Sequence, residues 1–333
     1  MDVRVGTAVA QPGHRSHGHL EIGRMADGSA ITLPVIIAAG REAGPVLWAQ
    51  GCIHGDEYGG AAALIEFARA LDLERLQGVL VALPVVNPSA FNQRARLSNL
   101  DGQNMNRVFP ASTAGSHSFQ VGAHLAEALK RNADYLLDLH NGGLAMEVPL
   151  HMIYMEDGSA TAAASKRLAK SLGCDVIWRG RASDGYAGTL IAEASRAGIP
   201  GVLVENGGGD CPTGEQIERY KACLENALKA LGMVPGRPVQ YERYTMIGNA
   251  RFLHSRQGGL FVRRCRVGAI VAEGEPFGRI IDLHGEGAEE IVSPVAGEAF
   301  VAGLRTSYYP THTGEMIGEL LAVEGHESAE AND

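Results

Sequence analysis

A histidine and a glutamate three residues apart, His54 and Glu57, are the first side chains in this sequence whose types and spacing suggest chemistry. They lie in the stretch Gly-Cys-Ile-His-Gly-Asp-Glu, between an apolar run at residues 45–50 and a helical pattern that begins near residue 61. At such a turn the imidazole and the carboxylate can converge on one point. With one more nitrogen ligand they would form a His2Glu zinc site with an open fourth position. An isolated HxxE pair is also compatible with a helix cap or a surface ion pair.

Two further residues with suitable chemistry end predicted strands. His140 follows the apolar run Leu-Leu-Asp-Leu, and Glu205 follows Gly-Val-Leu-Val and precedes three glycines. In open α/β sheets, ligands bind at the carboxyl ends of the strands. We therefore expect His54, His140 and Glu205 at one edge of a sheet. The predicted metal is one Zn²⁺ per chain, with His54, Glu57 and His140 as ligands.

The elements that must position these residues follow an α/β pattern. Apolar runs bounded by turns alternate with helical patterns, which favours strands covered on both faces. We predict a mostly parallel mixed sheet flanked by helices. The predicted strands are 45–50, 78–86, 135–139, 150–155, 174–178 and 201–204, and the predicted helices are 58–73, 116–131, 159–172, 188–197 and 213–231.

The chain is long enough for two domains, and its character changes near residue 236. Residues 1–235 are expected to form the α/β domain, in which residues 1–44 form short strands joined by glycine-rich turns. Residues 236–333 show glycine-rich strand patterns without a helical pattern, and predict a small, all-β, barrel-like domain. The polar loop at 87–115 is long for a compact domain, and such loops are often functional.

Composition limits the classes of partner. The formal net charge of -9 argues against nucleic acid and anionic membranes, because an acidic surface repels both. The cysteines are odd in number, 5, and form no CxxC pair, which is typical of a reduced cytosol. A basic segment followed by an apolar run is missing at the N-terminus, and no apolar run approaches a membrane span. We expect a cytoplasmic protein with a small-molecule substrate, either a monomer or a homo-oligomer.

The sequence resembles the succinylglutamate desuccinylase/aspartoacylase family, a branch of the zinc carboxypeptidase-like hydrolases. The motifs that carry the resemblance occur in family order over about residues 45–210 and are Gly-Cys-Ile-His-Gly-Asp-Glu-Tyr from residue 51, Asn87-Pro88, Asp-Gly-Gln-Asn-Met-Asn-Arg-Val-Phe-Pro from residue 101, Asp138-Leu139-His140 and Val204-Glu205. The resemblance implies a zinc carboxypeptidase-like fold with a small C-terminal β-domain. It also implies a zinc-dependent amidohydrolase that removes an N-acyl group from an amino acid or a related small amine.

The resemblance assigns roles to the catalytic residues. His54, Glu57 and His140 match the zinc ligands. Glu205 matches the general base, which takes a proton from the metal-activated water and passes one to the leaving amine. Arg96 matches the arginine that polarises the acyl carbonyl, with Arg94 as a rival.

The resemblance also assigns a substrate-binding set. Asn106 and Arg107 match a pair that binds a substrate carboxylate, for which the planar guanidinium is well suited. Tyr186 matches a substrate-contacting tyrosine, or is a packed loop residue. Asp138 either orients a zinc ligand or packs against a helix.

The sequence departs from the aspartoacylases after Tyr186. Residues 187–190 lack the arginine that holds the aspartate side chain, which counts against N-acetylaspartate as the substrate. Family members that deacetylate N-acetyl-diaminobutyrate share His-Gly-Asp-Glu-Tyr and a glycine-rich run after the glutamate. Three alternatives therefore remain open. They are deacetylation of this substrate, a carboxypeptidase-like action on short peptides, and a non-catalytic role in binding zinc or a small molecule.

Overall fold

The computed structural model describes residues 2–285 and 288–329. Its strands are β1 (Arg4–Val5), β2 (Ala8–Val9), β3 (Arg15–Arg24), β4 (Ala30–Ala39), β5 (Glu42–Gly51), β6 (Gln77–Leu83), β7 (Tyr135–His140), β8 (Met146–Met155), β9 (Val176–Gly180), β10 (Gly201–Gly208), β11 (Arg243–His254), β12 (Gly259–Arg263), β13 (Ile270–Ala272), β14 (Pro276–Ile281), β15 (Ala288–Val292), β16 (Glu298–Arg305), β17 (Pro310–Thr311) and β18 (Met316–Ser328). Its helices are α1 (Tyr58–Ala70), α2 (Pro88–Gln93), α3 (His117–Asn132), α4 (Ala160–Lys170), α5 (Leu190–Arg196) and α6 (Gly214–Ala230), with the short 3-10 helices η1 (Met105–Arg107) and η2 (Ala182–Asp184).

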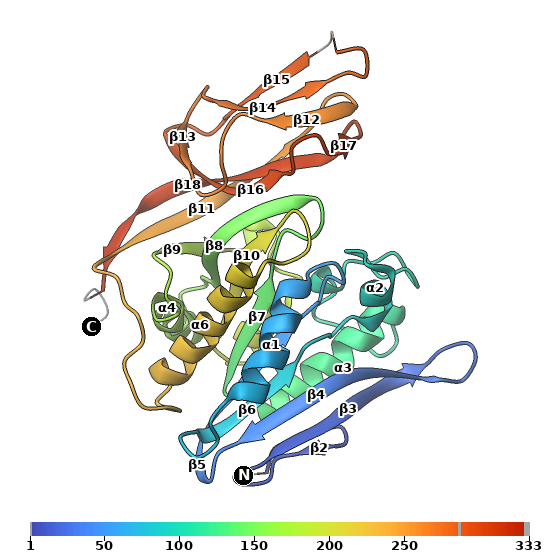
Figure 1. Cartoon of the computed structure of the whole chain (residues 1–333), viewed down its shortest axis with the longest axis vertical. Helices are drawn as coiled ribbons and strands as arrows, with labels where there is room; N and C mark the ends of the chain where they lie inside the picture. Colours follow the sequence, from blue (N-terminus) through green and yellow to red (C-terminus); the bar gives the residue numbers. More distant parts are fainter. Residues whose placement is uncertain (1, 286–287, 330–333) are drawn as a thin grey trace.

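A mixed sheet of 12 strands forms the centre of the molecule, in the order β13-β16-β18-β11-β9-β8-β10-β7-β5-β6-β4-β3. In Figure 1 it extends from the blue N-terminal hairpin at the bottom to the red and orange C-terminal strands at the top. Strands β6, β5, β7 and β10 are parallel neighbours, as are β8, β9 and β11. The other neighbouring pairs are antiparallel.

The prediction of a mostly parallel sheet was therefore wrong for both ends of the sheet. Parallel neighbours need a crossover connection, and helices supply these connections in the centre. At one end, β3 and β4 form a hairpin. At the other end, the described residues from β11 onward contain strands and no helix, and β11, β18, β16 and β13 pair antiparallel.

Helices cover both faces of the central strands. Along β5, Leu47 and Trp48 belong to different cores, because successive strand residues point to opposite faces. The core around Leu47 includes Leu64 of α1 and Leu224 of α6, two helices that lie side by side in front of the sheet in Figure 1. The core around Trp48 includes Leu125 of α3. The strand ends that carry the candidate site are thus held by a sheet that is buried on both faces.

Several predicted elements differ from the structure in extent. The N-terminal strands β3 and β4 are 10 residues each, not short. The loop at 87–115 contains α2 and η1. The boundary between the predicted domains, at residues 235 and 236, stays a prediction. The described residues leave out parts of both predicted domains, namely Met1, residues 286–287 and residues 330–333. Among the described helices, none is long and apolar enough to span a bilayer.

Candidate metal centre and active site

The turn between β5 and α1 positions the first two candidate ligands. Cys52 adopts a left-handed backbone conformation with a φ of 51°, and its thiol donates a hydrogen bond to the carbonyl oxygen of Glu57. Gly55 lies against α2, where a Cβ would come within 2.0 Å of the backbone carbonyl carbon of Ala90. Only glycine fits this close approach. The tight turn lets His54 and Glu57 face each other.

His54, Glu57 and His140 form a buried cluster, with exposed fractions of 2%, 1% and 1%. His54 Nδ1 lies 2.8 Å from Glu57 Oε1, and His140 Nδ1 lies 2.9 Å from Glu57 Oε2. One ligand atom from each residue lies within 4.8 Å of the others. The structure thus brings the three predicted metal ligands to one place, although His140 ends strand β7 and the other two lie in the turn between β5 and α1.

The outer ring nitrogens of both histidines face oxygen atoms. His54 Nε2 is 3.1 Å from Asn104 Oδ1, and His140 Nε2 is 3.2 Å from Asp138 Oδ2. With the ring protons on these Nε2 atoms, both Nδ1 lone pairs face the carboxylate of Glu57. Three electron-rich groups directed at one point repel one another unless a cation lies among them. The donor set and its outer partners therefore fit Zn²⁺.

The charges of the cluster also favour a cation. Burial raises the pKa of Glu57, but His54 and His140 outweigh it and hold this pKa well below its usual value. Burial lowers the pKa of His140, but Asp138 and Glu57 outweigh it and raise this pKa well above its usual value. The two carboxylates thus attract positive charge to His140, either a proton or a metal ion.

Glu205 lies beside this cluster at the end of β10. It is the register partner of His140 on the parallel strand β7, so both side chains emerge on the same face of the sheet. Its Oε2 is buried and has no hydrogen-bond partner among the described residues. Burial raises the pKa of Glu205 to about 8, although His140 acts to lower it. An acid with a raised pKa and an unpaired oxygen is suited to accept a proton.

Of the two rival arginines, Arg96 reaches the cluster. Its Nη1 donates to Glu57 Oε1 over 2.8 Å, while its side chain stays 47% exposed. Arg94 forms the C-terminal cap of α2 in a left-handed conformation with a φ of 52°, and no ion pair of Arg94 occurs among the described residues. The structure therefore places Arg96 at the candidate site and Arg94 outside the ligand cluster.

The predicted substrate-binding residues lie next to the ligands. The Oδ1 atom of Asn106 accepts a hydrogen bond from the backbone N–H of Leu190 over 2.9 Å, and its Nδ2 lies 3.4 Å from His140 Nε2. Arg107 is exposed as a residue, and its guanidinium lies over the ring of Tyr186, 5.7 Å from the ring centroid, and donates a hydrogen bond to the carbonyl oxygen of Asn106. Tyr186 also packs edge-on against Trp178, with ring centroids 4.9 Å apart. Tyr186 is therefore a packed residue that also contacts the candidate carboxylate-binding arginine.

The succinylglutamate desuccinylase/aspartoacylase catalytic domain, as a sequence profile, matches residues 43–231, which is more than half of the 333 residues. This chain belongs to that family. The matched region contains every candidate site residue described above. The family membership predicted from the short motifs is thus confirmed by the match to the catalytic domain profile over residues 43–231.

Individual relatives cover nearly the whole chain. The N-alpha-acetyl-L-2,4-diaminobutyric acid deacetylase of Halomonas elongata is 29% identical over 315 residues, which is 92% of this chain and 90% of that protein. A product-bound structure of the ectoine utilization protein EutE (DoeB) from Ruegeria pomeroyi superposes with a TM-score of 0.82 at 24% identity, over 93% of this chain and 95% of that chain. An aspartoacylase family protein from Mesorhizobium loti gives 0.78 at 25% identity, over 98% and 99%.

Two residues near the site were not predicted. The hydroxyl of Tyr220 on α6 contacts the carbonyl oxygens of His140 and Asn206, and so ties the ends of β7 and β10 together. Glu319 on β18 lies near Arg96 and Arg107, whose positive charges act on its carboxyl group. The sequence feature that could have pointed to Glu319 is its position as the one charged residue within the apolar run Ile-Gly-Glu-Leu-Leu.

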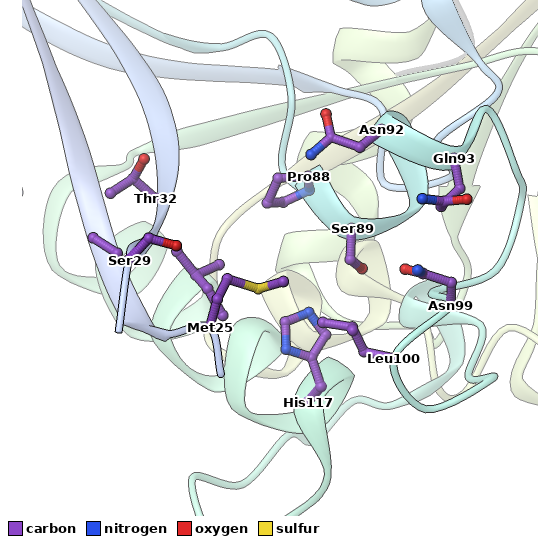
Figure 2. A pocket seen from close by; sticks show the side chains of 12 residues that line it. Met25, Ser29, Thr32, Pro88, Ser89, Asn92, Gln93, Asn99, Leu100 and His117 are labelled. Atoms are coloured by element: carbon purple, nitrogen blue, oxygen red, sulfur yellow. The ribbon is translucent and has the colours of Figure 1, made fainter. Parts of the chain in front are cut away.

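A cavity of about 410 Å³ lies apart from the candidate site, between the β3–β4 hairpin, α2 and the start of α3. Figure 2 shows its polar lining, including Asn92, Asn99 and His117. The Nε2 atom of His117 is buried and has no hydrogen-bond partner among the described residues. None of the predicted site residues lines this cavity.

Proposed function

We propose that the protein is a zinc-dependent amidohydrolase that removes an N-acyl group from a small acylated amino acid. The observation that carries this proposal is the buried cluster of His54, Glu57 and His140, with the unpaired acid Glu205 in register with His140. A purely structural metal site would use a fourth protein ligand, whereas a catalytic site keeps one position open. A neighbouring acid that holds no partner supports the catalytic assignment.

Each residue has a chemical task in this proposal. When bound, the zinc ion polarises the acyl carbonyl and lowers the pKa of the attacking water. Glu205 accepts the proton of that water and then delivers it to the nitrogen of the leaving amine. Arg96 directs its exposed guanidinium toward the negative charge that develops on the carbonyl oxygen. Asp138 and Asn104 hold the two imidazoles in orientation.

The proposed substrate is N-acetyl-2,4-diaminobutyrate. The relative from Halomonas elongata is named for the deacetylation of this compound. Arg107 would bind the substrate carboxylate with its planar guanidinium. Residues 187–190 contain no cation for the second carboxylate of N-acetylaspartate. We further propose a cytoplasmic location, since the five cysteines, Cys52, Cys174, Cys211, Cys223 and Cys265, are all free.

A substrate panel tests the proposal. The zinc-loaded protein is assayed with N-acetyl, N-succinyl and N-formyl amino acids, including N-acetyl-2,4-diaminobutyrate and N-acetylaspartate, and with dipeptides and tripeptides. We expect turnover of an N-acyl amino acid, greatest with N-acetyl-2,4-diaminobutyrate. Turnover of peptides alone would support a carboxypeptidase-like function instead. Zinc binding without turnover of any compound would support a non-catalytic role and overturn the proposal.

A further inference from the structure

Glu319 is a carboxylate without a partner in an otherwise apolar part of the C-terminal strands. Its neighbours on β18 include the buried residues Ile317, Leu320 and Leu321. Among residues 2–285 and 288–329, no hydrogen bond or ion pair engages its side chain. Glu324 on the same strand and Glu315, directly before the strand, both pair with arginines. Glu319 is partly buried, so its carboxylate loses part of its hydration without gaining a contact that compensates for the loss.

The register of the strands directs Glu319 toward the candidate active site. Side chains alternate along a strand, so Glu319 shares a face of β18 with Leu321. Leu321 packs in the same core as Tyr186, the residue that stacks with Arg107. The Glu319 side chain therefore lies on the face of the sheet that carries the substrate-binding residues.

The residue opposite Glu319 on β16 has no side chain that could pair with its carboxylate. Glu319 pairs with Gly303 on β16, and a Cβ built on that glycine would lie 3.6 Å from Glu319 Oε2 and 3.2 Å from the methyl group of Met146. Met146 begins β8, directly after the loop that follows His140. A glycine and a methionine methyl thus border the carboxylate, and neither can satisfy its charge.

The site already holds cations for the negative parts of an acyl-amino acid. Among the described residues, its unpaired carboxylates are Glu205, which is assigned to proton transfer, and Glu319, which has no task so far. Arg107 is placed for a carboxylate, and Arg96 for the carbonyl oxygen. The charge of Glu319 acts on the pKa values of Arg107, Tyr186 and Glu205, which agrees with its position on the face of the sheet that packs against Tyr186. Burial raises the pKa of Glu319 to about 7, although Arg96 and Arg107 act to lower it. A cation beside this carboxylate would restore its ordinary ionisation.

We propose that Glu319 binds the free ammonium group of the substrate and so makes the enzyme selective for N-acyl diamino acids. This inference rests on the proposed function and extends it to the choice of side chain. A substrate with a second carboxylate is repelled by Glu319, and one with an apolar side chain leaves Glu319 unpaired. The C-terminal strands thereby supply a specificity residue to a site whose metal ligands come from β7 and the β5–α1 turn.

The test compares two substrates of nearly equal shape. N-alpha-acetyl-2,4-diaminobutyrate carries the ammonium group, and N-alpha-acetylnorvaline carries a methyl group in its place. We expect the wild-type protein to prefer the diamino compound in kcat/KM, and Glu319→Gln to lose roughly 10- to 100-fold on that compound alone, the usual contribution of a charge-assisted hydrogen bond. The matched control is Glu298→Gln, an exposed glutamate on the adjacent strand β16, which should change neither substrate.

Product binding provides a second readout that does not depend on turnover. Isothermal titration should show weaker binding of 2,4-diaminobutyrate to Glu319→Gln and unchanged binding of norvaline. If Glu319→Gln lowers kcat/KM equally for both substrates, the residue is structural and the inference is overturned. If the wild-type protein treats both substrates alike, the ammonium subsite is wrong while the proposed function stands. If the wild-type protein hydrolyses neither, nor any other acyl-amino acid, the proposed function itself fails.

Discussion

Glu205 and His140 are register partners on the parallel strands β10 and β7, so an acid whose Oε2 has no hydrogen-bond partner among the described residues lies beside a candidate metal ligand. The pairing follows from strand geometry, because in-register residues of parallel neighbours point to the same face. Tyr220 contacts the carbonyl oxygens of His140 and Asn206 and so holds the two strand ends together. In the proposed mechanism His140 binds the metal and Glu205 accepts the proton, and the register pairing holds these two side chains next to each other.

The first prediction concerns Glu205. Glu205→Gln keeps the shape of the side chain and removes its basicity, so kcat on N-acetyl-2,4-diaminobutyrate should fall by roughly 10²- to 10⁴-fold. Zinc content, measured by elemental analysis, should remain near that of the wild-type protein. Retention of more than a tenth of the wild-type kcat would show that another group accepts the proton.

The second prediction concerns the metal ligands. His54→Ala removes one of three protein ligands, and the zinc content should fall from about one ion per chain to a small fraction of that value. Chelation of the wild-type protein should lower its melting temperature, because a metal that binds only the folded state stabilises it. The control is His254→Ala, an exposed histidine on β11. Full zinc content in His54→Ala would contradict the ligand assignment.

The third prediction separates the two arginines of the polar loop. Arg96→Ala should lower kcat by roughly 10²- to 10³-fold, because loss of one donor to the developing oxyanion typically costs this much. Arg94→Ala should change kcat by less than a few fold, since Arg94 caps α2 and lies outside the ligand cluster. Steady-state kinetics at saturating substrate distinguish them. Equal losses in both variants would mean that the loop, and not the Arg96 guanidinium, is responsible.

The fourth prediction concerns pH and stability. Burial acts to raise the pKa of Asp101, but hydrogen bonds from Ser118, Ser116 and Gln103 outweigh it and lower this pKa to about 2. Because the folded-state pKa is below the unfolded value of about 3.9, the stabilisation is complete above pH 4 and is lost as the pH falls toward 2. Asp101→Asn should cost about 1 kcal/mol of unfolding free energy at pH 7, as for a lost helix cap.

Urea unfolding at several pH values checks this prediction. The difference in unfolding free energy between the wild-type protein and Asp101→Asn should be constant from pH 7 to about pH 5 and should shrink below about pH 4. A difference that grows as the pH falls would contradict the assignment. Asp210→Asn supplies a control at a loop aspartate for which the structure shows only a local contact with its own neighbour Cys211.

The sequence by itself predicted which residues form the candidate metal cluster. Each candidate ends an apolar strand or follows one directly, and central parallel strands bring their carboxyl ends to one edge. This local pattern was sufficient to predict that His54, Glu57 and His140 meet, because strand length and direction follow from periodicity and from the helical crossovers. The helices α1, α3, α4 and α6 were predicted on the same grounds, and the structure shows them within three residues of the predicted ends.

Only the tertiary structure placed Arg96, and not Arg94, beside Glu57, and brought Glu319 to the face of the sheet that carries the candidate site. Arg94 ends α2 as its C-terminal cap, and Arg96, two residues further on, contacts Glu57. Glu319 reaches the site through antiparallel pairing of β18 with β16 and of β16 with β8. Periodicity tells which side of a strand a residue occupies, but not which distant strand lies beside it, because that choice is made by packing across the whole sheet.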